Sequence, residues 1–151
     1  MPEPGEQAPD FALPSTSGDV RLSEATKRGK VLLAFYYEDA TPICSSELSM
    51  LRDDYEVVRE LGAEVIAVSV DSLDSHEAFA ERLGGVPFPL ASDETLEAAK
   101  AFDVVDDSGK RSRRAVFVID RGGRVLHAER WLQPGNPSQY EAVFRALGLD
   151  V

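Results

Sequence analysis

Two short and mostly apolar runs, residues 31–37 and 64–70, most constrain the fold of this chain. Each is long enough for one buried strand, and each precedes a segment with apolar residues at helical spacing. After the first run these residues are Leu48, Leu51, Tyr55, Val58 and Leu61. A helix between two strands favours their parallel pairing, because parallel strands need a crossover connection. The two runs therefore predict a parallel pair within an α/β sheet.

Shorter segments extend this predicted sheet at both ends of the chain. Residues 11–13 and 20–22 are candidate short strands separated by a turn-like segment, and they predict an N-terminal β extension. Residues 87–90 predict a short edge segment, because its prolines cannot donate to a strand ladder. Residues 115–120 and 124–127, joined by a glycine-containing turn, predict a closing hairpin.

Helix starts are marked by residues that favour the N-cap or the first turn. The predicted starts are Ser23, Asp74 or Ser75, Asp93, and Asn136 followed by Pro137. The resulting order, β-α-β-α-(β)-α-β-β-α, predicts one domain over residues 1–151 with a mixed central sheet flanked by helices. This is the thioredoxin-like arrangement with an N-terminal β extension.

Composition and charge exclude several classes of partner. The 151 residues are 43% hydrophobic and 28% charged, which is typical of a soluble globular domain. A net charge of -11 argues against nucleic acid and acidic membrane surfaces. The longest apolar run is too short to span a bilayer, and the first thirty residues show no targeting segment. A single cysteine allows no internal disulfide and suits a reducing compartment, so we expect a cytoplasmic protein.

That cysteine, Cys44, lies in the sequence TPICSSE at residues 41–47, where the first strand gives way to a helix. We expect the thiol in the first helical turn, where free N–H groups and the helix dipole favour an anion. Such a position lowers the pKa of a thiol, and the thiolate is its reactive form. The placement predicts redox chemistry, although a lone cysteine is more often a buried small hydrophobe.

Four motifs, in register over nearly the whole chain, resemble the peroxiredoxin family. They are the opening Gly5-x-x-Ala8-Pro9-Asp10-Phe11-x-Leu13, the active-site Thr41-x-x-Cys44 with Glu47, the strand Arg114–Asp120, and the segment from His127-Ala128-Glu129 to Gln133-Pro134-Gly135. The last resembles the one-cysteine, alkyl hydroperoxide reductase E-type branch, close to the bacterioferritin-comigratory proteins. The resemblance implies a thiol-dependent peroxidase that reduces hydrogen peroxide or organic hydroperoxides.

The resemblance also implies roles for particular residues. Cys44 is the expected nucleophile, with the Thr41 hydroxyl, the Cys44 backbone N–H and the Arg114 guanidinium as donors to the transition state. Glu47 is expected to orient Arg114 through a bidentate pair, and the expected substrate-binding residues are Tyr37, Pro42 and Ile43. A single cysteine requires a thiol from outside the chain, which is a thioredoxin-like protein, a low-molecular-weight thiol or the Cys44 of a second subunit. We favour a mixed disulfide with an external thiol, because a cysteine in a first helical turn is expected to be too recessed for bridging between subunits. A homodimer is implied, and no cofactor or metal is indicated.

Two positions depart from the family pattern. The family's proline, seven residues before the cysteine, is Tyr37 here, and the resolving cysteine of the bacterioferritin-comigratory branch is Ser49. Because a tyrosine can either donate to a bound oxygen or block the pocket, a second hypothesis stays open. In that hypothesis the chain is a redox sensor or binding module without turnover.

Other side chains have simpler interpretations. Lys110, Arg111 and Arg113 are interpreted as a solvated loop cluster, and Trp131 is interpreted as core or interface packing rather than part of a cofactor site. The two histidines, His76 and His127, are far apart in the sequence, and no His/Cys group has metal-ligand spacing. A Cys-His hydrolase would require an oriented histidine, for which only His127 on the closing strand is a candidate.

Overall fold

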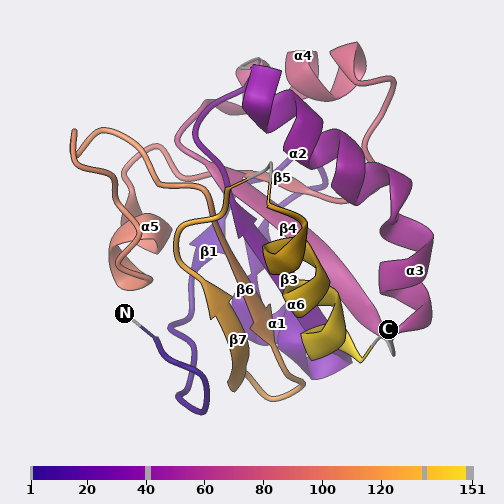
Figure 1. Cartoon of the computed structure of the whole chain (residues 1–151). Helices are drawn as coiled ribbons and strands as arrows, with labels where there is room; N and C mark the ends of the chain where they lie inside the picture. Colours follow the sequence, from indigo (N-terminus) through magenta and orange to yellow (C-terminus); the bar gives the residue numbers. More distant parts are fainter. Residues whose placement is uncertain (1, 40–41, 134–135, 149–151) are drawn as a thin grey trace.

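The computed structural model describes residues 2–39, 42–133 and 136–148, and leaves out the side chains of residues 42–47. Its centre is a five-stranded mixed sheet in the order β5-β4-β3-β6-β7 (Figure 1). The strands are β3 (Lys30–Phe35), β4 (Ala63–Ser69), β5 (Leu90–Ser92), β6 (Ala115–Ile119) and β7 (Val125–Glu129). The central strand β3 pairs parallel with β4 and antiparallel with β6, which confirms the predicted mixed sheet.

A small antiparallel hairpin precedes this sheet, and helices cover both of its faces (Figure 1). The hairpin consists of β1 (Ala12–Leu13) and β2 (Val20–Arg21), which confirms the predicted N-terminal extension. The helices are α1 (Leu22–Arg28), α2 (Pro42–Asp53), α3 (Tyr55–Glu60), α4 (Leu73–Arg82), α5 (Glu97–Ala101) and α6 (Pro137–Leu147).

Alternate residues of each central strand point to opposite faces and divide the core into two clusters. Leu33 and Phe35 face the hairpin, α1 and α5, where the rings of Phe102 and Phe117 are 5.0 Å apart. Leu32, Ala34 and Tyr36 face the other way, toward α2, α3, α4 and α6. Burial on both faces explains why the strand at residues 31–35 is a continuous apolar run instead of an alternating one.

The helix starts agree in part with the sequence. Asn136 caps α6, since its side chain accepts the Ser138 N–H at 3.0 Å, as predicted. The prediction of Ser23 as a cap was wrong: α1 begins one residue earlier, and the Asp10 carboxylate accepts the Ser23 N–H at 2.9 Å.

Two further helix starts lie near their predicted residues. The cap of α4 is Ser72, whose hydroxyl oxygen accepts a hydrogen bond from the Ser75 N–H. The helix therefore begins one or two residues before the predicted start at Asp74 or Ser75. The Asp93 carboxylate accepts the N–H groups of Ala98 and Ala99 at 3.0 and 2.9 Å. Asp93 therefore stabilises the start of α5, but the prediction of Asp93 as its cap residue was wrong, because the cap position is Leu96.

Three element boundaries differ from the sequence predictions. The helix predicted through residue 61 is interrupted at Asp54, which adopts φ -94° and ψ 7° between α2 and α3. The first strand ends at Phe35, so Tyr36 and Tyr37 lie in the connection that leads to α2. The edge strand β5 begins only at Leu90, because the prolines before it cannot donate to β4.

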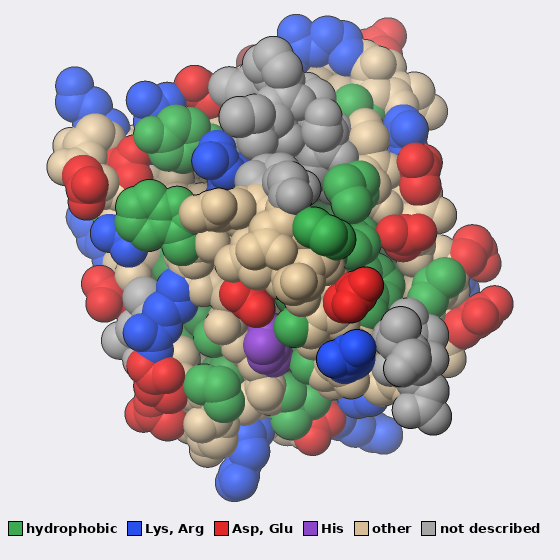
Figure 2. Space-filling view, in the orientation of Figure 1, with side chains coloured by type: hydrophobic (Ala, Val, Ile, Leu, Met, Phe, Trp, Pro, Cys, Tyr) green, Lys and Arg blue, Asp and Glu red, His purple; other side chains and the backbone are tan. Residues whose placement is uncertain are grey.

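The sheet topology brings three connections to one edge. Phe35 pairs with Val68 near the end of β4 and with Ala115 at the start of β6. The residues after β3, those after β4 and those before β6 therefore lie together. Within the described residues no helix is long and apolar enough to cross a membrane, and on the face in Figure 2 Lys and Arg are interspersed with Asp and Glu.

Candidate active site

For residues 42–47, which include the predicted nucleophile, the structure describes the backbone but not the side chains. Helix α2 begins at Pro42, so Cys44 lies in its first turn, as the sequence predicted. Thr41 lies outside the described residues, as do the side chains of Pro42, Ile43, Cys44 and Glu47. The expected roles of these five residues therefore stay predictions.

Tyr37 and Arg114, the other two predicted site residues, lie together. Arg114 immediately precedes β6, and its guanidinium carbon lies 5.6 Å from the centre of the Tyr37 ring. The backbone holds Arg114 firmly, since its carbonyl accepts the Leu132 N–H at 2.7 Å. Its Nε atom is buried and has no hydrogen-bond partner in the part of the chain described here. The guanidinium of Arg114 is always charged, and its unpaired Nε–H can donate to an anion or a peroxide oxygen.

Arg111 contacts the same ring from closer range. Its guanidinium carbon lies 4.2 Å from the Tyr37 ring centre, which is cation–π geometry. It also forms ion pairs with Glu38 at 2.9 Å and Asp106 at 3.6 Å. The interpretation of Arg111 as a solvated loop residue was therefore wrong, because its charge is paired and its plane covers Tyr37.

The carboxylate of Asp106 lies beside this group. Burial alone would raise its pKa, but the Ser108 hydroxyl, the Tyr37 hydroxyl, the Ser108 backbone N–H and the charge of Arg111 together hold the pKa below its usual range. The Ser108 N–H donates to this carboxylate at 3.0 Å. Asp106 is therefore ionised near neutral pH, and the Tyr37 hydroxyl is one of the groups that lower its pKa.

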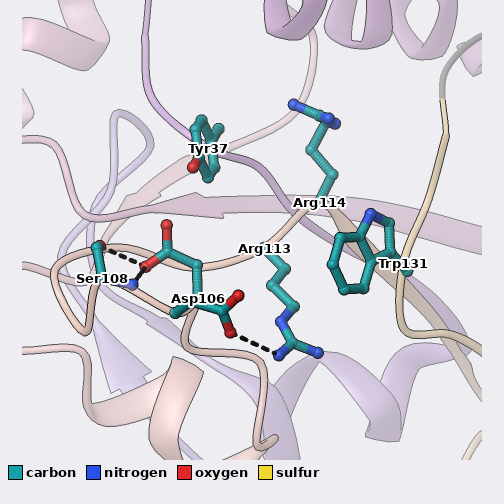
Figure 3. A pocket seen from close by; sticks show the side chains of 7 residues that line it. Tyr37, Asp106, Ser108, Arg113, Arg114 and Trp131 are labelled. Atoms are coloured by element: carbon teal, nitrogen blue, oxygen red, sulfur yellow. Dashed lines mark hydrogen bonds and ion pairs between the residues drawn. The ribbon is translucent and has the colours of Figure 1, made fainter.

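Tyr37, Asp106, Ser108 and Arg114 line an open pocket of about 280 Å³ (Figure 3). Trp131 forms another wall, and the Arg113 guanidinium carbon lies 5.0 Å from its ring centre. Trp131 is 57% exposed, so it is not a core residue, and its interpretation as interface packing stays a prediction. Arg113 also forms an ion pair with Asp107 at 3.5 Å, so it too is engaged and is not simply solvated. The pocket thus combines an aromatic wall with a paired arginine, Arg113, and the partly unsatisfied Arg114.

A second polar cluster lies on the other side of the same connection, and the sequence did not predict it. The Tyr36 hydroxyl donates to Asp39 at 2.7 Å, and the His76 Nδ1 atom lies 2.9 Å from the other carboxylate oxygen. The Ser75 hydroxyl donates to Asp39 at 2.7 Å. The Asp39 N–H donates to Asp71 at 2.8 Å. The cluster therefore ties the segment after β3 to α4 and to the end of β4.

Burial and charge set the protonation of this cluster. His76 and Tyr36 are fully buried, and the Asp39 side chain is 2% exposed. Burial alone would raise the pKa of Asp39, but hydrogen bonds from His76, Tyr36 and Ser75 hold it below its usual value. Burial and the Asp39 charge raise the pKa of Tyr36 well above its usual value. At neutral pH Asp39 is an anion and Tyr36 is a neutral donor.

Asp39, Asp71 and His76 offer potential metal-ligand atoms within 4.8 Å of one another. Each of these atoms already has a hydrogen-bond partner: Ser75 and His76 at Asp39, Ser69 and the Asp39 N–H at Asp71. The arrangement is therefore a satisfied hydrogen-bond network. The sequence signal for it is weak, because Asp39 and His76 are 37 residues apart.

Comparisons with known proteins agree with the resemblance. Residues 4–128 match the model of the AhpC/TSA family. A peroxiredoxin of Thermoplasma volcanium is 36% identical over 122 residues, which cover 77% of this chain and 59% of that protein. Peroxiredoxin Bcp of Bacillus subtilis is 39% identical over 132 residues, which cover 82% of each chain. This chain thus spans only 59% of the length of the Thermoplasma relative.

Solved structures show the same similarity. Peroxidoxin BcpB from Mycobacterium tuberculosis superimposes with a TM-score of 0.85 at 29% identity, over 97% of both chains. The bacterioferritin comigratory protein of Xanthomonas campestris gives a TM-score of 0.80 at 28% identity, over 91% of this chain and 89% of the other. These similarities confirm the predicted thioredoxin-like fold over nearly the whole chain.

Proposed function

The chain belongs to the AhpC/TSA family of peroxiredoxins, and we propose that it is a thiol-dependent peroxidase with Cys44 as its single redox-active group. The observation that carries the proposal is the position of Arg114. The residue lies beside the connection from β3 to α2, its Nε atom is buried and unpaired among the described residues, and it faces the ring of Tyr37. A fixed cation at this place can stabilise the oxyanion that leaves when a peroxide bond breaks.

In the first step the Cys44 thiolate attacks one peroxide oxygen, and a sulfur–oxygen bond forms as the oxygen–oxygen bond breaks. The leaving oxygen takes the electron pair and a proton and departs as water or an alcohol. Sulfur is oxidised to sulfenic acid while the peroxide is reduced. Arg114 would donate to the leaving oxygen, with Thr41 and the Cys44 N–H as further donors and Glu47 orienting the guanidinium.

The second half of the cycle would require an external thiol. The chain has one cysteine, so the sulfenic acid cannot form a disulfide within it. One thiol would displace water from the sulfenic acid to form a mixed disulfide, and a second would release Cys44 as thiol. We propose a thioredoxin-like protein or a low-molecular-weight thiol as the reductant, in the cytoplasm, and a cycle like that of the one-cysteine E-type branch. A homodimer is part of the same proposal.

Organic hydroperoxides fit the pocket beside Tyr37. The pocket of about 280 Å³ is open and has an aromatic wall at Trp131, which suits a substrate larger than hydrogen peroxide. The similar Xanthomonas campestris protein is described for its alkyl peroxide reduction activity. We therefore include alkyl hydroperoxides among the proposed substrates.

One observation favours the second candidate function, a redox sensor or binding module. The Tyr37 ring lies against Arg111 and near Arg114, and its hydroxyl interacts with Asp106. Tyr37 thus occupies the place where the family has a proline, with partners of its own. In this alternative Cys44 would be oxidised slowly and would not turn over.

Stopped-flow mixing with hydrogen peroxide or an alkyl hydroperoxide distinguishes a peroxidase from a redox sensor or binding module. Trp131 is the only tryptophan and lines the pocket, so its fluorescence should report oxidation of Cys44. Cys44→Ser is the control without a redox group. We expect a fast fluorescence change, a gain of one oxygen in intact mass, and steady turnover with an added thiol. Oxidation no faster than that of a free thiol would overturn the peroxidase proposal.

A further inference from the structure

The buried cluster of Tyr36, Asp39 and His76 connects the reactive segment to helix α4. Asp39 lies three residues before the start of α2, and His76 lies in the second turn of α4. Their side chains meet at 2.9 Å, where both are almost completely shielded from water. The Tyr36 carbonyl is also held, because it accepts the Ser112 hydroxyl at 3.0 Å. The two residues that flank Tyr37 and Glu38 in the chain are therefore fixed from several directions.

The hydrogen-bond partners of His76 define its protonation. Its Nε2 atom lies 3.0 Å from the carbonyl oxygen of Ala91, which can only accept, so Nε2 carries a proton. Its Nδ1 atom lies 2.9 and 3.1 Å from the two oxygens of Asp39. The Tyr36 hydroxyl is 3.1 Å from Nδ1, but it donates to Asp39 at the shorter distance of 2.7 Å. Nδ1 therefore faces acceptors and must donate as well.

Other groups in contact with the cluster agree with this assignment. The charged and titratable groups that face His76 are Asp39 and Tyr36 from the segment after β3, and Asp71 from the end of β4. Both carboxylates are acceptors in their hydrogen bonds to Ser75 and Ser69. The carboxylate oxygens of Asp39 are therefore acceptors beside Nδ1, which fits a donating Nδ1.

We propose that His76 is a buried imidazolium whose ion pair with Asp39 holds the segment of residues 36–39 against α4, and that His76 is thereby a positioning residue for the reaction at Cys44. This proposal rests on the proposed peroxidase function. The pair would fix the exit of the chain from β3, and with it the direction in which Tyr37 faces Arg111 and Arg114. It would also fix the approach to the first turn of α2, so its loss should misplace the thiol relative to its donors.

The protonation is testable without any enzymatic assay. The chain has two histidines, and His127, which contacts Glu129 at 2.8 Å near the surface, is the matched reference. Nitrogen-15 NMR of labelled histidine, assigned with His127→Gln, should show both nitrogens of His76 protonated at pH 7. A neutral-tautomer pattern for His76 at that pH would overturn the assignment.

The positioning role is tested by His76→Gln, with His127→Gln as the control. We expect peroxide oxidation of Cys44 to slow roughly tenfold to a hundredfold in the first variant and to stay within about twofold in the second. Adding the external thiol at higher concentration should not restore the oxidation rate. Unchanged oxidation in a folded His76→Gln protein would overturn the positioning role.

Amide hydrogen exchange gives a second readout that does not depend on activity. Exchange at residues 36–39 and in the first turn of α2 should accelerate in His76→Gln, while β6 and β7 stay protected. If that variant does not fold, Tyr36→Phe removes only the hydroxyl from the cluster and should show the same local pattern more weakly. Exchange that accelerates uniformly over the chain would overturn the proposal that the His76–Asp39 pair holds residues 36–39 against α4. If the wild type reduces no peroxide, the peroxidase proposal fails, while NMR and hydrogen exchange still test whether the His76–Asp39 pair holds residues 36–39.

Discussion

Tyr36 and Tyr37 are neighbours in the chain, but their side chains enter opposite kinds of environment. Tyr36 is fully buried and donates to Asp39 in a cluster where the hydrogen bonds are satisfied. Tyr37 is half-buried beside an open pocket, with the guanidinium groups of Arg111 and Arg114 near its ring, and the Nε atom of Arg114 has no partner among the described residues. The first environment is closed and can only hold the chain in place. The second has an unused donor and open volume, so it can bind.

The contrast follows from the end of β3. A strand alternates its side chains between the two faces, and Tyr36 still follows this alternation after β3 has ended at Phe35. Tyr37 does not follow it, because it packs against the same cluster as Tyr36. Tyr36 is fully buried on the face covered by α2, α4 and α6, while Tyr37 is only partly buried against the same cluster and also contacts Arg111 and Arg114 before β6. One connection thus serves both purposes, and substitutions on its two sides should affect different properties of the protein.

The largest expected effect is on stability, at Asp39. Asp39→Ala leaves His76 buried without its counter-ion and should lower the free energy of unfolding by about 3–5 kcal/mol. Urea denaturation followed by circular dichroism measures this change. Asp107→Ala is the control, because that carboxylate is 94% exposed in its pair with Arg113 and should contribute less than about 1 kcal/mol. Equal losses in the two variants would remove the distinction between the closed and open regions.

On the open side, the largest effect should be on rate, at Arg114. Arg114→Ala should slow peroxide oxidation by about 10²–10³-fold, or about 2.7–4 kcal/mol in barrier, because a preorganised donor to the leaving oxygen is lost. Arg113→Ala is the matched control, since the adjacent arginine covers Trp131 and pairs with Asp107. Stopped-flow oxidation rates at several pH values separate this effect from a change in thiol pKa. Similar losses in both variants would show that only the general positive charge matters.

The fold could be predicted largely from local patterns. The apolar runs of β3 and β4, the glycine turn before β7 and the Asn136 cap of α6 each depend on neighbouring residues, and each was confirmed. The interruption at Asp54 was not predictable in the same way, because the helical spacing of apolar residues continues through it from α2 into α3.

The candidate site could likewise be predicted only where its features follow from local motifs. The proximity of Tyr37 and Arg114 follows from motifs whose order is visible in the sequence. The pairing of Asp39 with His76, and the stacking of Arg111 on Tyr37, depend on residues tens of positions apart that only the folded sheet edge brings together. In the sequence, an arginine of a solvated loop looks the same as an arginine that packs on an aromatic ring, as Arg111 does on Tyr37. The roles of Thr41, Cys44 and Glu47 stay predictions, because the described side chains do not include them.

Acid should weaken the closed region through Asp39. Its pKa in the folded protein lies below the usual 3.8 of an aspartate, so the unfolded state takes up a proton first as pH falls. The stabilisation is therefore complete above about pH 3.8 and is lost as pH falls through the lower folded value.

The measurement is urea denaturation of the wild type and Asp39→Asn at a series of pH values from neutral to strongly acidic. Asp10 and Asp106 also have lowered pKa values and titrate in both proteins, so the difference between the two curves isolates Asp39. We expect the wild type to be more stable at neutral pH and the difference to shrink in acid. A difference that does not change with pH would mean that Asp39 contributes only by packing.

The smallest expected effect is that of the Tyr37 hydroxyl. Tyr37→Phe keeps the ring against Arg111 and removes only the group that interacts with Asp106, so the change in stability should be about 1 kcal/mol or less. The pKa of Asp106 should rise toward its usual value, which carboxyl NMR measures. Peroxide oxidation should slow several-fold if the hydroxyl also donates to bound peroxide.

Tyr37→Pro restores the family residue at the same position and tests the ring itself. Loss of the ring should free Arg111 and Arg114 from one contact and open the pocket, so bulky alkyl hydroperoxides should gain rate relative to hydrogen peroxide. If this variant instead turns an inert protein into a fast peroxidase, the natural chain is a sensor or binding module and Tyr37 is its block. If neither substitution changes any rate, Tyr37 does not act on the peroxide. The open region then depends on the other residues that line the pocket, Arg113, Arg114 and Trp131 among them.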